Sequence, residues 1–377
     1  MSRQKKKINI GAVIGFAGAL LVGGGIGFFG AQAIDQMSGG SDGLFFLYLG
    51  VMLLGLYLAF LVQIIVHEAG HLVCGLLSGY QFVSFNVLGL IWQKDARGKL
   101  HFGRMPLAGG AGGQCLMAPP DYNGGNLPFT LYNLGGVLAN LIFSSLCALL
   151  SWVIPAAPVR ILLMVHAVVG VGLALLNALP LPLEALQNDG KNLLCIRKDE
   201  TARRAFWVQM SIAAAIAQGT RLKDMPEDWF SPMPEAALDN AIVCAIPVIN
   251  TSRLMDQLNF TAAEREIHTL LARKKGVVGV YRTSMTCDGA VCELLAGRLG
   301  PLVSALANKE HQAVIKAMKN HPSILRTQYA LALLHEKDAD KAGKLLATFE
   351  AAAAKHPNPQ EITGERELLA AIKEAAQ

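Results

Sequence analysis

Residues 44–77 read LFFLYLGVMLLGLYLAFLVQIIVHEAGHLVCGLL, an apolar run with the motif His-Glu-Ala-Gly-His at positions 67–71. The run is longer than the roughly 20 apolar residues that a helix needs to cross a bilayer. On that helix His67 and His71 are four residues apart and share one face, so both imidazoles can bind one metal ion. Ionisable groups are costly inside a membrane, and this cluster therefore indicates a functional site.

The glutamate of the motif, Glu68, is turned about 100° from His67 around the helix axis. This offset favours contact with a metal-bound water over contact with the metal. Zinc lowers the pKa of a bound water towards about 7, and a neighbouring carboxylate can then accept its proton. The motif therefore predicts a zinc centre with Glu68 as the general base.

The composition predicts a membrane half and a soluble half. Hydrophobic residues make up 53% of the 377 residues and charged residues only 16%, and the apolar residues are concentrated before about residue 190. We expect a membrane-embedded domain over residues 1–190, with spans at about 8–34, 44–77, 129–154 and 159–179. The fold class expected from this pattern is an all-α polytopic membrane protein with a short β-hairpin, followed by a soluble α-helical domain.

The charge pattern bears on orientation and partners. Arg3, Lys5, Lys6 and Lys7 precede the first expected span and indicate a cytosolic N-terminus. Four spans would return the C-terminus to the same side. We expect a multi-pass integral protein of a bacterial cell membrane, with the lipid bilayer around it and both termini cytosolic. The net charge of +5 is spread out, and no basic stripe with interleaved aromatics predicts a nucleic-acid partner.

The segment between the second and third spans predicts a β-hairpin. Residues 81–93 are rich in β-branched and aromatic residues, 94–99 form a polar turn, and 100–105 form a short return strand. We expect this hairpin at the inner face of the membrane. Its edge could pair with an extended substrate strand. The hairpin could equally be an interfacial plug, and the residues leave both interpretations open.

A catalytic zinc ion usually has three protein ligands and an open fourth position. After the fourth span, Pro180 and Pro182 break the helix, and Glu184 and Asp189 are the carboxylates available as the third ligand. Asn140, in the third span, could bond a neighbouring helix or orient a substrate carbonyl. The residues alone favour the helix contact.

The C-terminal half predicts soluble helices. Residues 191–234 look like a linker helix and a Pro-rich connection, and residues 235–377 like successive amphipathic helices of a cytosolic domain. The helices are similar to tetratricopeptide-type pairs, with uneven spacing. This domain is either a surface that binds a protein partner or a plain helical domain.

The motif at 67–71, taken with Asn177, Pro180 and Asp189-Gly190, resembles the site-2 protease family of intramembrane zinc metalloproteases. The resemblance covers about residues 44–190. It implies that His67, His71 and Asp189 bind Zn²⁺ and that Glu68 is the general base.

Two further features of the resemblance concern Asn140 and Asn188. The stretch from Gly135 to Asn140 looks like the family's Gly-Pro-x-x-Asn element, with Gly136 in the place of Pro, and it implies a substrate-positioning role for Asn140. Asn188 stands where the family has Leu, and the gap from Asn177 to Asp189 is about one helical turn longer than usual. Glu184 therefore stays open as a third ligand.

The expected function is that of a zinc metalloendopeptidase that hydrolyses a peptide bond in a membrane-bound protein or peptide. The main alternative is a non-catalytic membrane scaffold or receptor whose helical C-terminal domain binds partners. A structural zinc site usually has four protein ligands and needs no carboxylate beside them, so Glu68 favours the enzyme. A metal transporter would line a path with ionisable residues across more spans.

Overall fold

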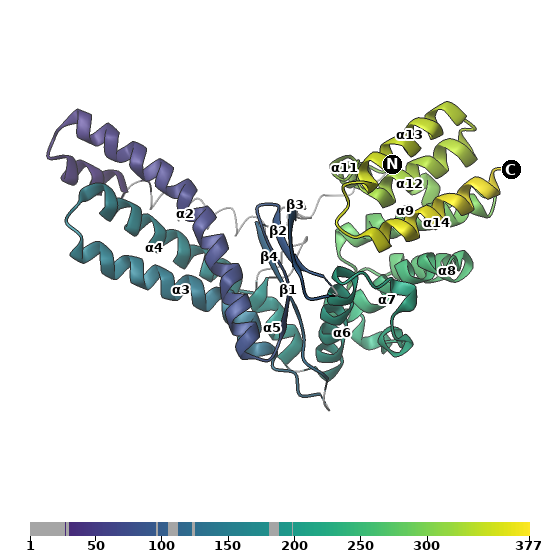
Figure 1. The fold of residues 1–377 in the computed structure, drawn as a ribbon, viewed down its shortest axis with the longest axis horizontal. Coiled ribbons are helices and arrows are strands. Elements are labelled where there is room, and N and C mark those ends of the chain that lie inside the picture. Colours follow the sequence, from purple (N-terminus) through teal and green to yellow (C-terminus); the bar gives the residue numbers. More distant parts are fainter. Residues whose placement is uncertain are drawn as a thin grey trace, which may run out of the picture. The chain divides into compact units, whose positions relative to one another are not determined.

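The computed structural model describes residues 27, 30–95, 97–104, 112–122, 125–180, 188–197 and 199–377. Most of the first expected span and Glu184 lie outside these residues. The chain divides into two compact units, one within residues 1–78 and 128–194 and the other within residues 79–127 and 195–377. Both units are mostly helical, and the second also holds a small sheet (Figure 1).

The first unit is built on three long helices: α2 (Asp42–Leu77), α3 (Phe129–Val153) and α4 (Ala157–Ala178). Each pair of these helices is in contact, and each helix is long and apolar enough to cross a membrane. Their ends differ from the expected spans by at most two residues. Large apolar side chains such as Phe46 and Trp152 are exposed on them, as on lipid-facing helices. The short helix α5 (Asp189–Arg197) follows.

Small residues allow α2 and α3 to approach closely. A Cβ atom added to Gly70 of α2 would lie 2.2 Å from the carbonyl oxygen of Gly135 in α3. A Cβ atom on Gly135 would in turn lie 2.5 Å from the carbonyl oxygen of Gly70. This contact brings the backbone of α3 against the turn of α2 that carries the two histidines.

The second unit holds a four-stranded antiparallel sheet, where the sequence predicted a two-stranded hairpin. The strands are β1 (Gln81–Val87), β2 (Leu90–Lys94), β3 (Leu100–Arg104) and β4 (Gly113–Ala118), in the order β3-β2-β1-β4. The turn between β2 and β3 lies where it was expected. The expected first arm, residues 81–93, is itself two strands, because the chain reverses at Leu88 and Gly89, which have φ angles of 54° and 79°.

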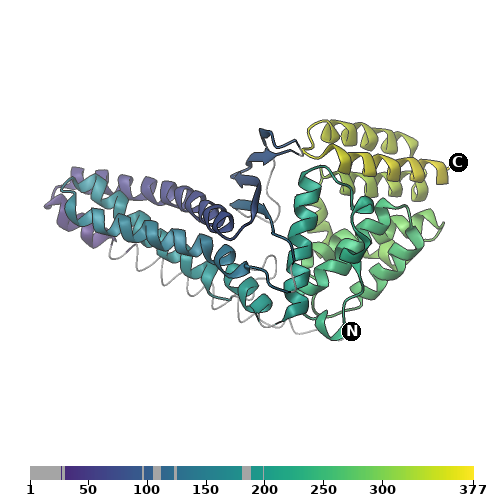
Figure 2. The same ribbon diagram turned by 60° about the horizontal axis from the view of Figure 1, so that its bottom comes forward.

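The domain boundaries differ from the expected ones. Helix α6 (Glu200–Ala217) packs against the sheet: the Trp207 indole donates to the Pro120 carbonyl at 2.8 Å, and the Gln93 amide donates to the Ala217 carbonyl at 2.5 Å. The sheet therefore belongs with the C-terminal helices and not with the membrane domain, and α6 is part of a folded unit instead of a linker (Figure 2). Bonds between α6 and the sheet cannot be read from local sequence pattern.

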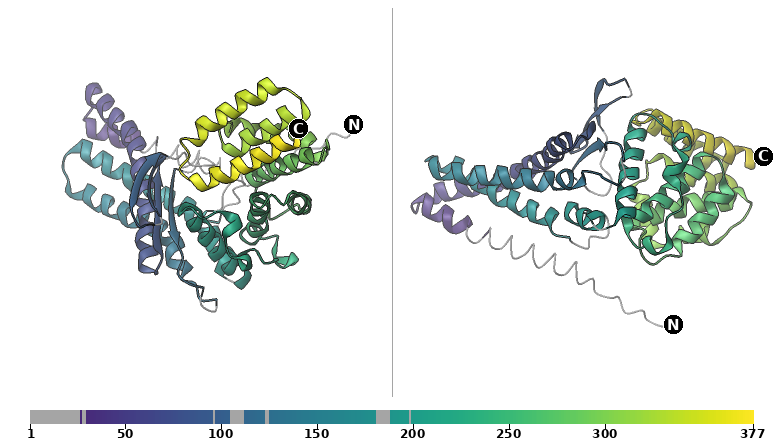
Figure 3. Two further views of the ribbon diagram at one scale, coloured as in Figure 1. Left: turned by 45° about the vertical axis from the view of Figure 1, so that its right-hand side comes forward. Right: turned by 90° about the horizontal axis from the view of Figure 1, so that it is seen from below.

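The rest of the second unit is helical (Figure 3). Three 3-10 turns follow α6, over Leu222–Asp224, Glu227–Phe230 and Glu235–Ala237. The helices are α7 (Ala241–Asp256), α8 (Phe260–Leu271), α9 (Gly279–Leu295), α10 (Pro301–Ala305), α11 (Lys309–Ala317), α12 (Pro322–Ala330), the π-turn η5 (Leu331–His335), α13 (Ala339–Ala353) and α14 (Pro359–Ala375). Neighbours α7–α8, α8–α9 and α12–α13 pack against one another around two apolar clusters, one containing Phe349 and Ile372 and the other Ile267 and Met285. The likeness to tetratricopeptide repeats stays a prediction.

Candidate metal centre

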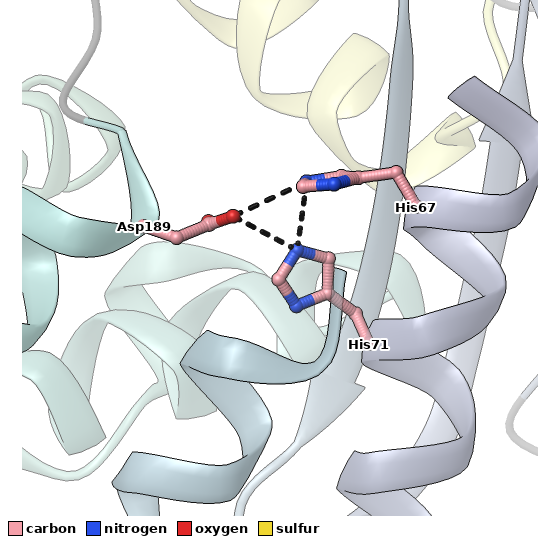
Figure 4. A group of neighbouring side chains, drawn as sticks. All are labelled: His67, His71 and Asp189. Atoms are coloured by element: carbon pink, nitrogen blue, oxygen red, sulfur yellow. Dashed lines mark hydrogen bonds and ion pairs between the residues drawn. The ribbon is translucent and has the colours of Figure 1, made fainter. Parts of the chain in front are cut away.

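Three potential metal ligands converge in the first unit (Figure 4). His67 and His71 project from the same face of α2, and Asp189 meets them from the start of α5. The Nε2 atoms of the two histidines are 3.2 Å apart, and they lie 3.2 Å and 3.4 Å from Asp189 Oδ2. In a tetrahedral zinc site with bonds of about 2.0–2.1 Å, ligand atoms lie about 3.3 Å from one another. The three atoms thus have the mutual spacing of three zinc ligands.

The other ring nitrogen of each histidine has a partner that can only accept in its present orientation. His71 Nδ1 lies 2.8 Å from the backbone carbonyl oxygen of Tyr132, so Nδ1 donates. His67 Nδ1 lies 3.1 Å from Asn140 Oδ1. A neutral imidazole that donates through Nδ1 keeps its lone pair on Nε2. Both Nε2 lone pairs therefore face the carboxylate.

Asp189 supplies the negative charge of the group. Burial raises the pKa of the Asp189 carboxyl, but when the two imidazoles are protonated, their hydrogen bonds and charges outweigh burial and hold this pKa at about 2. The buried Oδ2 atom accepts no hydrogen bond from the described residues. Three lone-pair donors facing one another without a proton between them repel, and a cation at their centre removes the repulsion. Zn²⁺ fits this set because it prefers imidazole nitrogen and carboxylate oxygen.

Asn188 ties the start of α5 to the end of α4. Its amide donates to the carbonyl oxygens of Leu176, at 2.7 Å, and Leu179. Its own Oδ1 accepts from the backbone N–H of Lys191 at 3.0 Å, as an N-cap does. These bonds of Asn188 place Asp189 beside the histidines.

Gly136 leaves the space in which the His67 ring lies. A Cβ atom at this position would lie 2.4–2.6 Å from three atoms of the imidazole. Any side chain at position 136 would therefore displace the ring. The His67 ring can take this position only because residue 136 has no side chain.

The predicted site residues differ in how closely they lie to the two histidines and in whether the structure describes them. Of the two carboxylates left open as the third ligand, Asp189 meets the histidines, whereas Glu184 lies outside the described residues. Glu68 is buried on α2 between the two histidines, and its role as general base stays a prediction. Asn140 contacts His67, one of the three predicted ligands, and its role in positioning a substrate stays a prediction.

Two site residues were missed from the sequence. Gln63 is fully buried and contacts Asn140, and the Tyr132 carbonyl holds His71. A signal existed for Gln63, because it lies four residues before His67 on the same helix face and is polar within an apolar run. The contact between the Tyr132 carbonyl and His71 could not be predicted from the sequence, because every residue type has a backbone carbonyl.

Comparison of the chain with models of protein families, with curated proteins and with solved structures finds no match. A functional assignment therefore depends on the chemistry of the site.

Proposed function

We propose that this protein is an intramembrane zinc metalloprotease similar to the site-2 protease family. The observation that carries the proposal is the spacing of 3.2–3.4 Å among the Nε2 atoms of His67 and His71 and the Oδ2 atom of Asp189. Three protein ligands leave one tetrahedral position open, which is the arrangement of catalytic rather than structural zinc sites. The three side chains are 11–18% exposed, so water has access to the group.

The chain's own residues would each take one part of the reaction. His67, His71 and Asp189 hold the metal ion, which when bound supplies a Lewis acid to the scissile carbonyl. Glu68 takes a proton from the attacking water and passes it to the leaving amine. The water's oxygen becomes part of the new carboxylate, and the peptide C–N bond breaks.

The substrate class follows from the setting of the ligands. Both histidines lie on a helix that is apolar enough to cross a membrane, so the peptide bond to be cut would belong to a membrane-bound protein or peptide. A helical segment hides its carbonyls in internal hydrogen bonds, and it must unwind before cleavage. The exposed edge strand β3 offers backbone groups to which an extended segment could add. A multi-pass topology with cytosolic termini completes the proposal.

The test combines zinc content with hydrolysis. The full-length protein, purified in detergent and reconstituted into liposomes, is mixed with a library of single-span membrane peptides, and new termini are identified by mass spectrometry. We expect about one zinc ion per chain and cleavage of some peptides in the wild type, and retained zinc with cleavage lost in Glu68→Gln. Glu184→Ala should keep its zinc.

Two outcomes would overturn the proposal. Full cleavage by Glu68→Gln would show that Glu68 is not the general base. A wild-type protein that takes up no zinc would favour the alternative of a membrane scaffold or receptor that works through its helical domain.

A further inference from the structure

A chain of buried polar groups links His67 of α2 to the backbone of α4. Gln63 of α2 and Asn140 of α3 are both fully buried, and their amides contact each other. The chain ends at the backbone carbonyl of His166 in α4. We call Gln63 and Asn140 the amide pair.

The direction of every hydrogen bond in this chain follows from its fixed end. The His166 carbonyl oxygen can only accept, so the Gln63 atom 2.8 Å from it is the donating Nε2. Gln63 Oε1 then faces Asn140 and accepts from Nδ2 at 2.9 Å. Asn140 Nδ2 also donates to the backbone oxygen of Gln63 at 3.2 Å. Asn140 Oδ1 is thereby left facing His67 Nδ1, which must donate.

We infer that the amide pair positions the metal ligand His67 by holding it in the tautomer whose Nε2 lone pair faces the metal. Asn140 is thus a positioning residue for a zinc ligand, and Gln63 orients Asn140. A turned Asn140 amide would present N–H groups to Nδ1 and shift the proton to Nε2, where it blocks the metal. This inference rests on the proposed function only in assuming that the group binds zinc.

The neighbouring helix α4 leaves room for the amide pair at Gly170. A Cβ atom added to Gly170 of α4 would lie 2.2 Å from Gln63 Nε2 and 2.1 Å from Ser144 Oγ. Ser144 accepts from Gln63 Nε2 at 3.4 Å, a weaker contact on the same amide. A buried polar chain in which each donor meets an acceptor specifies one arrangement of its members.

The test measures zinc affinity by chelator competition, together with the visible spectrum of the Co²⁺-substituted protein. We expect Asn140→Leu to weaken zinc binding about 10- to 100-fold, the usual cost of losing the partner of a metal-bound histidine. Asn140→Asp should bind zinc nearly as wild type, because a carboxylate accepts from Nδ1 in either orientation. Gln63→Met should weaken binding by about 10-fold, since Asn140 then keeps one acceptor of two.

The double variant Gln63→Met/Asn140→Asp decides between positioning and packing. We expect it to bind zinc more tightly than Gln63→Met alone, because the carboxylate introduced by Asn140→Asp would need no orienting partner. Ser144→Ala is the matched control. It removes one contact of the Gln63 amide, but the bond to the His166 carbonyl still fixes the orientation of that amide. The zinc affinity of this variant should therefore equal that of wild type.

The inference fails if wild type binds zinc and Asn140→Leu or Gln63→Met binds it equally well, or if the double variant shows no recovery. A wild type that binds no zinc would instead contradict the proposed function, so the two failures are distinguishable. A purely substrate-positioning role for Asn140 would leave the Co²⁺ spectrum and zinc affinity unchanged.

Discussion

The molecule contains two groups of potential metal ligands among its described residues, one in each unit. His67, His71 and Asp189 form the first, and Glu264, His268 and Glu293 of the helical domain form the second. In the second group the carboxylates already have donors. Glu293 accepts from the backbone N–H groups of Leu302 and Val303 at 2.9–3.1 Å, and Glu264 accepts from Arg298 at 2.6–2.8 Å.

The first group differs because no donor of the described residues satisfies its central atoms. Each imidazole uses its one proton on the outer side, towards Asn140 or the Tyr132 carbonyl, and Asp189 Oδ2 receives none. Proximity of ligand residues alone is therefore a weak criterion for a metal site. The direction of the surrounding hydrogen bonds distinguishes a group whose central atoms have no donor from a group whose carboxylates are already satisfied.

The largest effect on zinc binding is expected from removing a ligand of the first group, and no effect from removing one of the second group. Asp189→Ala should lower zinc affinity by more than the roughly 100-fold that loss of an outer partner costs, since only the two imidazoles remain. His268→Ala, at an exposed position of the second group, should leave zinc content at the wild-type value. Zinc lost from His268→Ala and retained in Asp189→Ala would reverse the comparison.

Arg326 of the helical domain forms a buried charged cluster whose carboxylates also have their hydrogen-bond donors. Its buried guanidinium donates to Glu365 at 3.1 Å and to Asp288. Arg326→Met would leave two buried carboxylates without their cation, and we expect a loss of about 3–5 kcal/mol in the free energy of unfolding of this domain. Urea unfolding followed by hydrogen exchange would measure it, with zinc content unchanged.

The matched control for Arg326 is Arg366→Met, which removes an exposed ion pair with Glu350. Exposed pairs contribute about 0–1 kcal/mol, so its stability should stay close to that of wild type. Equal losses in the two variants would show that burial does not distinguish these arginines.

A smaller effect is expected at the glycine beside His67. Gly136→Ala puts a methyl group against the imidazole ring, and we expect zinc affinity to fall about 10-fold as the ring shifts. Gly172→Ala is the control, because a Cβ atom there meets nothing within 4 Å. Chelator competition on both variants measures the difference. Unchanged affinity in Gly136→Ala would mean that the ring position tolerates displacement.

The smallest effect concerns the pH dependence of the helical domain. Burial raises the pKa of Glu365 to about 7 against the opposing charge of Arg326, so Glu365 makes the fold less stable as pH rises from 4.5 to 7. Burial, aided by His356 and Arg326, lowers the pKa of His321 to about 4, so His321 makes the fold less stable as pH falls from 6.5 to 4. The two dependences oppose each other in the wild type.

His321→Gln should remove the acid-side loss and expose the effect of Glu365. We expect the thermal midpoint of the variant to drop by roughly 2–4 °C more than that of wild type between about pH 4.5 and pH 7. Scanning calorimetry at the two pH values would measure it. The same change of the thermal midpoint with pH in both proteins would mean that His321 does not offset the effect of Glu365 on stability.

The sequence predicted the parts of the fold that depend on local pattern. The three described spans follow from apolar runs, and His67 and His71 follow from a four-residue spacing on one of them. The sheet was only half predicted, because Leu88 adopts a positive φ that its residue type does not signal. Strand β4 follows a Gly-rich stretch that reads as a loop, and its pairing with β1 is a long-range contact.

The site shows the same limit. Asp189 was one of two open carboxylates, because the distance between α2 and the start of α5 is set by tertiary packing. Asn188 looked like a departure from the family pattern, yet it caps α5 and joins it to α4. A substrate-positioning role for Asn140 stays a prediction. Its contact with His67 could not be read from the sequence, because it depends on the approach of α3 to α2 at Gly70 and Gly135.

The most direct test of the metal centre is the zinc K-edge absorption spectrum of the purified full-length protein. We predict a four-coordinate shell of two imidazole nitrogens at about 2.0–2.1 Å and two oxygens, one from Asp189 and one from water. In Asp189→Ala the carboxylate contribution should disappear or the zinc should be lost. A wild-type protein without zinc, or a zinc shell containing sulfur, would contradict the assignment of His67, His71 and Asp189 as the ligands.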